Sequence, residues 1–232
     1  MEGALLLDKP ANWTSFDAVN YIRGVISRQL RLPKRQIKVG HSGTLDPFAT
    51  GLLIILIGKN YTRQANKLLK LDKTYLAKAQ FGAVSSTGDP EGVIRPFAPT
   101  IPKPDTTELI NTLNLFKGRL EQIPPAFSAV KVNGRRAYQL SRKGHSFELK
   151  PRPITVKDIH LVRYGYPEAE IELTVSSGTY IRTLIEDIGR ELGCGAYTTV
   201  LKRLSIGDYS LSDAVKIEQI SERSIADCLI RL

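Results

Sequence analysis

The chain has 232 residues, 42% of them hydrophobic, which is enough for one large domain with a real core. Its 33 Lys and Arg outnumber 23 Asp and Glu, and the net charge of +10 favours a polyanionic partner such as nucleic acid. The two cysteines and three histidines have neither disulfide nor metal-ligand spacing, and the N-terminal apolar run is too short for a signal peptide or a membrane span, so we expect a cytoplasmic protein.

The first half of the chain is predicted to form a short buried strand, a helix with Ser15 as its N-cap, a central strand, a short helix and an alternating strand. These elements lie at residues 4–7, 16–26, 52–57, 60–71 and 73–81. The helix is identified by apolar residues at helical spacing, from Phe16 to Ile26, and the last strand places Tyr75 and Phe81 on one face.

The second half begins with a Pro-rich connection, a helix, a hairpin at Asn133-Gly134 and a basic helical segment. Two neighbouring strands, a helix stopped by Gly193 and a terminal helix follow. These elements lie at residues 96–104, 107–116, 129–134, 135–143, 154–162, 171–175, 181–192 and 221–230. Strand pairs joined by short turns predict an α/β (α+β) fold, with a mixed, mainly antiparallel sheet flanked by helices.

The basic residues gather in two runs. Residues 23–38 hold six Lys and Arg and no acid, and residues 131–163 hold nine against Glu148 and Asp158. Solvated surface charge is the ordinary explanation for such residues, but runs of this kind are also typical of a surface that follows phosphates.

The segment GHSGTLDPFATG, residues 40–51, is dense in glycine and polar residues for an ordinary connection. Pro47 disfavours a helical conformation at Asp46, so the carboxylate is predicted to lie on a stiff, extended turn. A nucleophile elbow would need glycine where Thr44 stands, a P-loop would need Gly-Lys before Ser or Thr, and a metal site would need further ligands. Turn capping by Asp46 remains the local alternative.

The same segment resembles the signature of the TruB family of tRNA pseudouridine-55 synthases, with its Gly-Thr-Leu-Asp-Pro core. The resemblance continues in the family's order over nearly the whole chain. Its further motifs are LLLDKP, Lys73-Thr74-Tyr75, QIPPAFSAVKVNGRRAYQLSRKG, SGTYIRTLIEDIG and LKRLSIG.

The resemblance implies the pseudouridine synthase catalytic fold and a set of site residues. The family's nucleophile matches Asp46, the histidine that helps to open the T loop matches His41, and the arginine that pairs with the nucleophile matches Arg182. The aromatic residue that stacks on the base matches Tyr75, and a second tyrosine that contacts the substrate matches Tyr180.

Three further positions are implied more weakly. Leu201 matches the apolar wall of the uracil pocket, Lys9 matches the family's N-terminal Lys-Pro, and Asp89 matches a retained acid. Alone, Leu201 and Tyr75 would be interpreted as core residues, His41 as a turn residue and Lys9 as part of a surface ion pair. Ser86 stands where the family commonly has another Asp, so this chain lacks the carboxylate of that position.

If Tyr180 and Arg182 end a strand, their side chains project to one side, where Arg182 could pair with Asp46 and favour its ionised form. The implied reaction detaches uracil from uridine, turns it and rejoins it through carbon, with no cofactor and no metal. The implied substrate is the T stem-loop of tRNA, whose uridine must be flipped out, with binding that weakens steeply as salt rises.

Residues 1–232 are expected to form a single catalytic domain, to lack the C-terminal PUA-type RNA-binding domain of many bacterial members, and to act as a monomer without a protein partner. An RNA-binding module or RNA chaperone that grips tRNA without chemistry is the main alternative. A hydrolase built on Ser42 and His41 is the more distant one.

Overall fold

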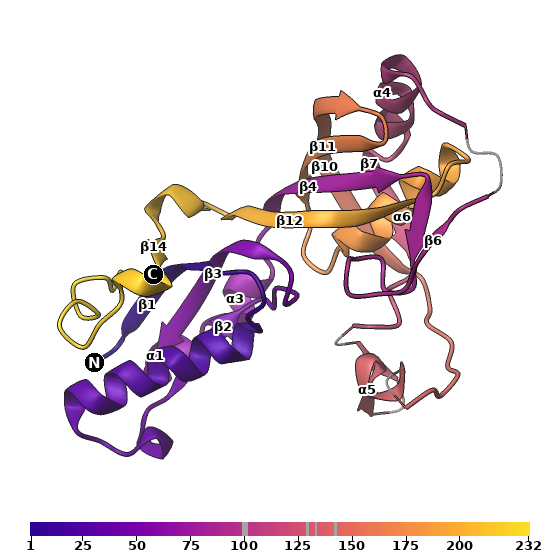
Figure 1. The fold of residues 1–232 in the computed structure, drawn as a ribbon. Coiled ribbons are helices and arrows are strands. Elements are labelled where there is room, and N and C mark those ends of the chain that lie inside the picture. The colour runs from indigo at the N-terminus through magenta and orange to yellow at the C-terminus, as the bar shows by residue number, and fades with distance from the viewer. Residues whose placement is uncertain (99–101, 129, 133, 142) are drawn as a thin grey trace. The chain divides into compact units, whose positions relative to one another are not determined.

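The computed structural model describes residues 1–232 except 99–101, 129, 133 and 142. The chain packs into two compact units: unit 1 is Met1–Tyr75 with Leu201–Leu232, and unit 2 is Leu76–Val200. The strands β4 (Lys73–Phe81) and β12 (Ala196–Ile206) contribute residues to both units (Figure 1). The expectation of a single catalytic domain stays a prediction. Within the described part of the chain, no helix is both long and apolar enough to span a membrane.

The strands of unit 1 are centred on β3, in the order β14-β1-β3-β12. The bounds are β1 (Gly3–Lys9), β2 (Val39–Ser42), β3 (Thr50–Ile57), β13 (Tyr209–Ser210) and β14 (Val215–Lys216). β1 runs antiparallel to β3 along its whole length (Figure 1). The other edge of β3 pairs antiparallel with β2 at residues 54–57 and parallel with β12 at Thr50 and Gly51. β3 is therefore central, as its uninterrupted apolar sequence predicts.

The helices of unit 1 are α1 (Ser15–Leu30), α2 (Lys59–Thr62), α3 (Ala65–Leu69) and the short 3-10 helices η1 (Lys34–Gln36), η2 (Leu211–Asp213) and η3 (Ile217–Gln219). α1 buries Val19, Ile22, Val25 and Ile26. A cluster on one face of β1 and β3 packs with α2 and α3. It contains Ala4, Leu6, Leu52, Ile54, Leu56, Leu68 and Ile206, with Tyr61 and Ala65 against it.

The start of α1 differs from the prediction. Its N-cap is Thr14, not Ser15, because Thr14 and Asp17 form a capping box in which each side chain bonds the other's backbone. Phe16, predicted on the apolar face, is 59% exposed, so that part of the prediction is wrong. Ser15 is buried and is free to bond elsewhere.

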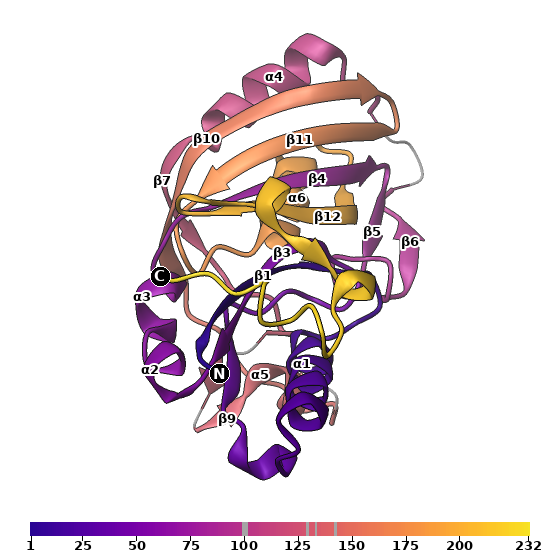
Figure 2. The same cartoon turned by 90° about the vertical axis from the view of Figure 1, so that its left-hand side faces the viewer.

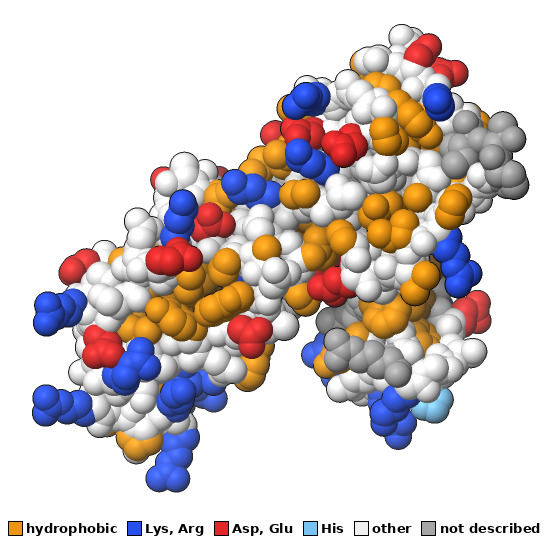
Figure 3. Space-filling view, viewed as in Figure 1, with side chains coloured by type: hydrophobic (Ala, Val, Ile, Leu, Met, Phe, Trp, Pro, Cys, Tyr) orange, Lys and Arg blue, Asp and Glu red, His pale blue; other side chains and the backbone are white. Residues whose placement is uncertain are grey.

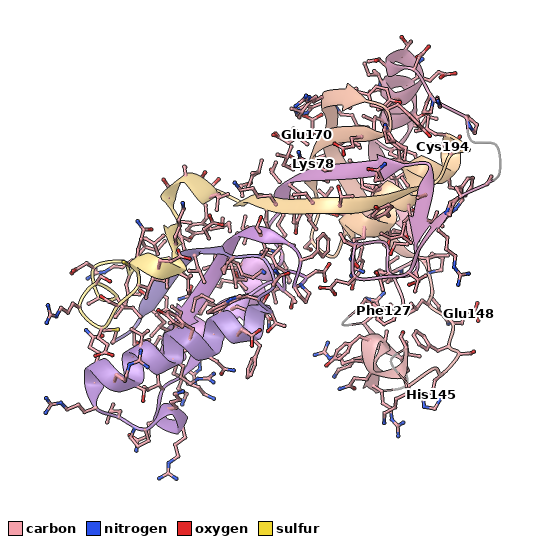
Figure 4. The ribbon with its side chains drawn as sticks, viewed as in Figure 1. Lys78, Phe127, His145, Glu148, Glu170 and Cys194 are labelled. Atoms are coloured by element: carbon pink, nitrogen blue, oxygen red, sulfur yellow. The ribbon has the colours of Figure 1, made fainter. Side chains whose placement is uncertain are left out.

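Unit 2 orders its strands β12-β4-β11-β10-β7. The bounds are β5 (Ala83–Ser85), β6 (Ile94–Pro96), β7 (Gly118–Gln122), β8 (Lys131–Val132), β9 (Arg135–Arg136), β10 (Arg152–Gly165) and β11 (Glu168–Val175). Antiparallel pairs join β10 to β11 and to β7, β5 to β6, and β8 to β9. Lys78 of β4 and Glu170 of β11 form an ion pair of 2.7 Å across neighbouring strands (Figure 4). The mixed, mainly antiparallel sheet is thus confirmed.

The helices of unit 2 are α4 (Thr106–Leu115), α5 (Ala137–Ser141) and α6 (Ile181–Glu191). α4 begins at an Asp105–Glu108 capping box and lies along β10 (Figure 2). α6 buries Ile181, Leu184, Ile185 and Ile188, at the spacing predicted for it. Gly193 has a φ of +69°, as expected of the residue that stops this helix.

Several predictions need correction. The predicted terminal helix at residues 221–230 is a series of turns, in which Ser221 and Ser224 bond each other and nearby backbone. Tyr180 and Arg182 do not end a strand, because Tyr180 is the N-cap of α6 and Arg182 lies in its first turn. The predicted helix at residues 60–71 is two short helices, and among the described residues of 135–143 only 137–141 are helical.

Three predictions fall partly outside the described residues. The Pro-rich connection includes residues 99–101, the predicted hairpin includes Ala129 and Asn133, and the basic helical segment includes Arg142. On the described flanks of the hairpin, β8 and β9 pair antiparallel, which confirms the reversal of the chain there. The strand β12 was not predicted at all.

Candidate active site

The Asp46 loop, residues 43–49, leaves β2 and enters β3. Asp46 is half-buried, and its carbonyl oxygen accepts a hydrogen bond of 3.1 Å from the Ala49 amide. The loop begins at Gly43, which has a φ of +89°, and it is followed by Gly51, with a φ of +97°. Both values favour glycine. At Gly51 a Cβ would also lie 2.3 Å from the Arg203 carbonyl oxygen, so β12 can pair with β3 only beside a glycine.

Both neighbours of Asp46 in the chain are held by unit 1. The Leu45 amide donates to the Ser15 Oγ at 2.8 Å, and that hydroxyl donates to the Leu45 carbonyl at 3.2 Å. The Pro47 carbonyl accepts from the Asn12 amide at 2.8 Å and from the Lys9 Nζ at 3.2 Å. The carboxylate is therefore carried on a backbone that is fixed on either side of it.

Lys9 is completely buried at the end of β1. Its ammonium donates to the carbonyls of Pro10, Trp13 and Pro47, which together satisfy its three protons. Burial lowers the pKa of Lys9 to about 8, the charge of Asp46 opposes that change, and the charge of Arg203 adds to it. The buried ammonium therefore lies in the field of the Asp46 carboxylate and attracts it. The interpretation of Lys9 as part of a surface ion pair is wrong.

His41 lies on β2, paired with Ile55 of β3. Burial, and after it the charge of Arg203, lowers the pKa of His41, which keeps the imidazole neutral at pH 7. Its Nδ1 has no hydrogen-bond partner among the described residues. Tyr75 on β4 and Leu201 on β12 belong to the same unit and are 7% and 5% exposed.

In unit 2, Arg182 is 4% exposed and its guanidinium is surrounded by acceptors. It forms an ion pair of 3.1 Å with Asp89, and it donates to the carbonyls of Thr87 at 2.6 Å and Phe127 at 3.2 Å. Arg182 is therefore a buried charge in the first turn of α6 and not a surface charge. A buried guanidinium with acceptors in several directions has a fixed orientation.

Asp89 is 4% exposed, and its carboxylate is used within unit 2. Besides Arg182, it accepts from the Thr87 hydroxyl at 2.5 Å and from the Glu91 amide at 3.0 Å. Ser86, at the position where the family commonly has Asp, accepts from the Val93 amide at 2.9 Å and so closes the turn between β5 and β6. These contacts make Asp89 a support for Arg182.

Tyr180 is held through its backbone. Its amide donates to the Gln122 side chain at 2.8 Å, and that side chain donates back to the Tyr180 carbonyl at 3.0 Å. Gln122, at the end of β7, is 3% exposed. Four residues beyond Arg182 lies Glu186, whose pKa is raised to about 7 by burial, against the opposing charge of Arg182.

The predicted site residues thus fall into two groups. Unit 1 contains Lys9, His41, Asp46, Tyr75 and Leu201, and unit 2 contains Asp89, Tyr180 and Arg182. Each group is held by hydrogen bonds and packing inside its own unit. The pairing of Arg182 with Asp46 joins residues of different units and stays a prediction.

Unit 1 also has a cavity of about 250 Å³. It is lined by Asp8, Lys9, Pro10, Thr50, Lys202, Lys216, Ile217 and Glu218. Of the predicted site residues, the cavity touches Lys9 alone. We therefore place the candidate site at the Asp46 loop and not in this cavity. Among the described residues no group of three or more His, Cys, Asp or Glu side chains could hold a metal ion.

Apart from the half-buried Arg23, the described Lys and Arg residues of the two basic runs are exposed. Arg28, Arg31, Lys34, Arg35 and Lys38 are exposed at the end of α1 and in the segment after it, where Figure 3 shows blue side chains gathered. In the second run the described Lys and Arg residues are exposed as well. Arg28 is partly neutralised by Glu222 at 2.5 Å, which leaves the remainder of the first run as a positive surface.

Two family models match the chain. Residues 30–181 match the TruB family pseudouridylate synthase N-terminal domain. Residues 182–228 match the tRNA pseudouridylate synthase B C-terminal domain. The chain belongs to the TruB family. The boundary between the two TruB models falls inside α6, so it does not coincide with either unit of the fold.

Relatives in this family are similar over most of their length. The tRNA pseudouridine synthase B of Phocaeicola vulgatus is 46% identical over 95% of this chain and 93% of its own. That of Clostridium kluyveri is 40% identical over 99% of this chain and 76% of its own. That of Chlamydia trachomatis is 39% identical over 93% of this chain and 85% of its own.

Solved structures share the fold of this chain. A chain of a Cbf5–Nop10–Gar1 complex superposes with a TM-score of 0.68 at 26% identity, over 94% of this chain and 53% of that one. A chain of an H/ACA RNP bound to a substrate RNA containing 2′-deoxyuridine gives 0.66 at 24% identity, over 94% and 51%. The chain thus spans about half the length of these solved relatives. The pseudouridine synthase fold is confirmed.

Sequence reasoning missed four residues that support this TruB site. Ser15 was interpreted as a helix cap, although it bonds the residue before Asp46. Arg203 and Gln122 lie within quoted family motifs but were not singled out. Thr87 bonds Asp89 and Arg182 through different atoms. The available signal for Arg203 and Gln122 was their place inside the quoted family motifs, because polar neighbours interrupt the apolar pattern at both positions.

Proposed function

We propose that this chain isomerises the T-loop uridine at position 55 of tRNA to pseudouridine, with Asp46 as the nucleophile. The observation that supports this most is the Asp46 loop, where an acid in a TruB family signature is held on both sides by buried donors. A turn-capping Asp would not need two buried side chains committed to its neighbours. The relatives named above as tRNA pseudouridine synthase B support the choice of tRNA.

The reaction exchanges one bond of the uridine for another. The N1–C1′ bond breaks and a C5–C1′ bond forms, while C5 loses its hydrogen as a proton and N1 gains one. Nothing is oxidised or hydrolysed, so a covalent carboxylate and a pocket that holds the free uracil suffice. Tyr75 and Leu201, both buried in unit 1, provide the apolar and aromatic surface that such a pocket needs.

The remaining residues have roles in binding and orientation. Arg182, whose guanidinium is fixed by its acceptors, is suited to orient a negatively charged group, and Tyr180 contacts the substrate. His41, neutral at pH 7, is suited to replace a stacked base by a hydrogen bond when the uridine is flipped out. The exposed basic runs bind tRNA phosphates, so tRNA affinity falls steeply as salt rises. The enzyme acts in the cytoplasm, as a monomer.

The test is an unmodified tRNA transcript labelled with tritium at C5 of uracil. We expect the wild type to release one label per tRNA, and Asp46→Asn to release none while binding tRNA with unchanged affinity. Asp208→Asn, at an exposed turn of the same unit, is the matched control and retains activity. Equal release by Asp46→Asn would overturn the role of Asp46, and an RNA chaperone without chemistry would release no label even as wild type.

A second transcript with cytidine at position 55 tests the target nucleotide. Because the other uridines keep their label, release should disappear if position 55 is the target. Release that persists at one label per tRNA would show a different target and would overturn the assignment to the T loop.

A further inference from the structure

Arg203 of β12 is among the largest fully buried side chains of the protein, and it lies against the Asp46 loop. Its Nε donates to the Leu52 carbonyl at 2.7 Å, and one terminal nitrogen donates to the Gly43 carbonyl at 3.1 Å. Gly43 is the first residue of the Asp46 loop, and Leu52 lies three residues beyond its end. One guanidinium therefore joins the first residue of the loop to the strand β3 that the loop enters.

The backbone of Arg203 holds the same place. Arg203 pairs with Gly51 and Lys202 pairs with Thr50, in the short parallel stretch where β12 replaces β2 along the edge of β3. Glycine has no Cβ, so the Arg203 backbone can approach Gly51 closely. β12 thus pairs with β3 directly after the loop, and its Arg203 side chain reaches back to the first loop residue.

The positive charge of Arg203 is energetically unfavourable at this position. It is buried near Lys9, His41 and Lys73, and it lowers the pKa of each. A buried cation among other cations destabilises the fold, so a merely space-filling residue here would be better as Leu or Met. An apolar residue cannot donate the two hydrogen bonds, in two directions, to the carbonyls of Gly43 and Leu52.

We infer that Arg203 is a positioning residue that fixes the Asp46 loop by bridging Gly43 to Leu52, and so sets the place of the carboxylate for the reaction. The inference rests on the proposed function of Asp46. Three side chains then fix the loop: Ser15 holds Leu45, Lys9 holds Pro47, and Arg203 holds the ends. A displacement of about 1 Å at a reacting group costs on the order of a hundredfold in rate.

The test compares Arg203→Lys with the wild type. Lysine keeps the charge and most of the aliphatic stem, but its single ammonium cannot reproduce the guanidinium fork. We expect kcat to fall at least tenfold, with KM for tRNA and the tRNA Kd unchanged within threefold. Amide hydrogen exchange at residues 43–49 should accelerate, while exchange in α1 stays as in the wild type. Arg203→Gln, a neutral variant, should show the same pattern.

The control is Ile26→Ala in the core of α1, which lowers the stability of the same unit without touching the loop. It should leave kcat within threefold and should not accelerate exchange selectively at residues 43–49. An Arg203→Lys variant with normal kcat and normal loop exchange would overturn the inference. Asp46→Asn in the same assay separates the two claims: if it is inactive while Arg203→Lys is normal, the proposed function stands and only the role of Arg203 fails.

Discussion

The two units hold their polar groups in opposite ways. In unit 1, buried donors at Ser15, Lys9 and Arg203 bond the backbone that carries an acid. In unit 2, buried acceptors, among them Asp89 and the Thr87 carbonyl, surround a guanidinium directly. An acid can be positioned through its backbone because its side chain is short. A long arginine side chain has to be fixed at its charged end, since its many rotamers leave the end undefined otherwise.

The comparison predicts that unit 2 is the less tolerant of conservative change. Arg182→Lys should lower kcat by roughly a hundredfold to a thousandfold, because an ammonium cannot reach the acceptors that orient the guanidinium or form a two-pronged bond with a carboxylate. KM should change less than kcat. Tritium release under saturating tRNA measures the effect.

Arg190→Lys on the same helix is the control for this change. Arg190 pairs with Asp187 at 2.7 Å on an exposed face, where an ion pair contributes little and a lysine can replace it. Its activity should equal that of the wild type. If Arg182→Lys also stays within threefold of the wild type, the fixed guanidinium has no part in the reaction.

The fold was largely predictable because its strands and helices follow simple periodicities. β3 and β4 and the helices α4 and α6 came from apolar spacing, and they are confirmed. β12 was missed because Lys202, Arg203 and Ser205 interrupt its apolar pattern. Arg203 is buried at one of those positions. The polar residue that interrupts the apolar pattern of the strand is therefore the one that hydrogen-bonds the Asp46 loop.

Of the candidate site, the identities of the residues came from the family resemblance and their supports came from the structure. No spacing in the sequence relates Lys9 to Pro47 or Gln122 to Tyr180, which are 38 and 58 residues apart. Such bonds depend on which strands become neighbours. The geometry predicted for Tyr180 and Arg182 failed because a strand period was assumed where the helix had already begun.

In unit 1 the expected effect of losing the Lys9 ammonium is smaller and is measured as a loss of stability. Lys9→Met keeps the aliphatic stem but removes the donor from three carbonyls, so unfolding should require about 2 kcal/mol less at pH 7, even though a buried charge is removed. Denaturant unfolding measures the difference. Lys59→Met, at an exposed position, should lose less than about 0.5 kcal/mol.

The effect of Lys9 should grow with pH. Its pKa is about 8 when folded and near 10.5 when unfolded, so above pH 8 the unfolded chain binds a proton that the folded chain does not. Wild-type stability therefore gains from a rise in pH, and Lys9→Met lacks this gain. The difference between them should widen by roughly 2 kcal/mol between pH 8 and 9.5. A constant difference would mean that Lys9 is not desolvated as its burial indicates.

The smallest expected effect concerns Glu186, beside Arg182 in unit 2. Burial raises its pKa to about 7, above the unfolded value of 4.5. The contribution of Glu186 to the free energy of unfolding is therefore largest below pH 4.5, and it is lost as the pH rises to 7. A glutamine at this position does not ionise, so Glu186→Gln does not lose this stability. Above pH 7.5 the variant should be more stable than the wild type by about 1 kcal/mol, after allowance for partial solvent screening. Thermal unfolding at pH 5 and pH 8 gives the measurement, with the exposed Glu191→Gln as control. If the stability difference between the wild type and Glu186→Gln is the same at both pH values, the charge of Arg182 fully compensates the burial of Glu186. Unit 2 would then surround its guanidinium with a second ionised acid besides Asp89.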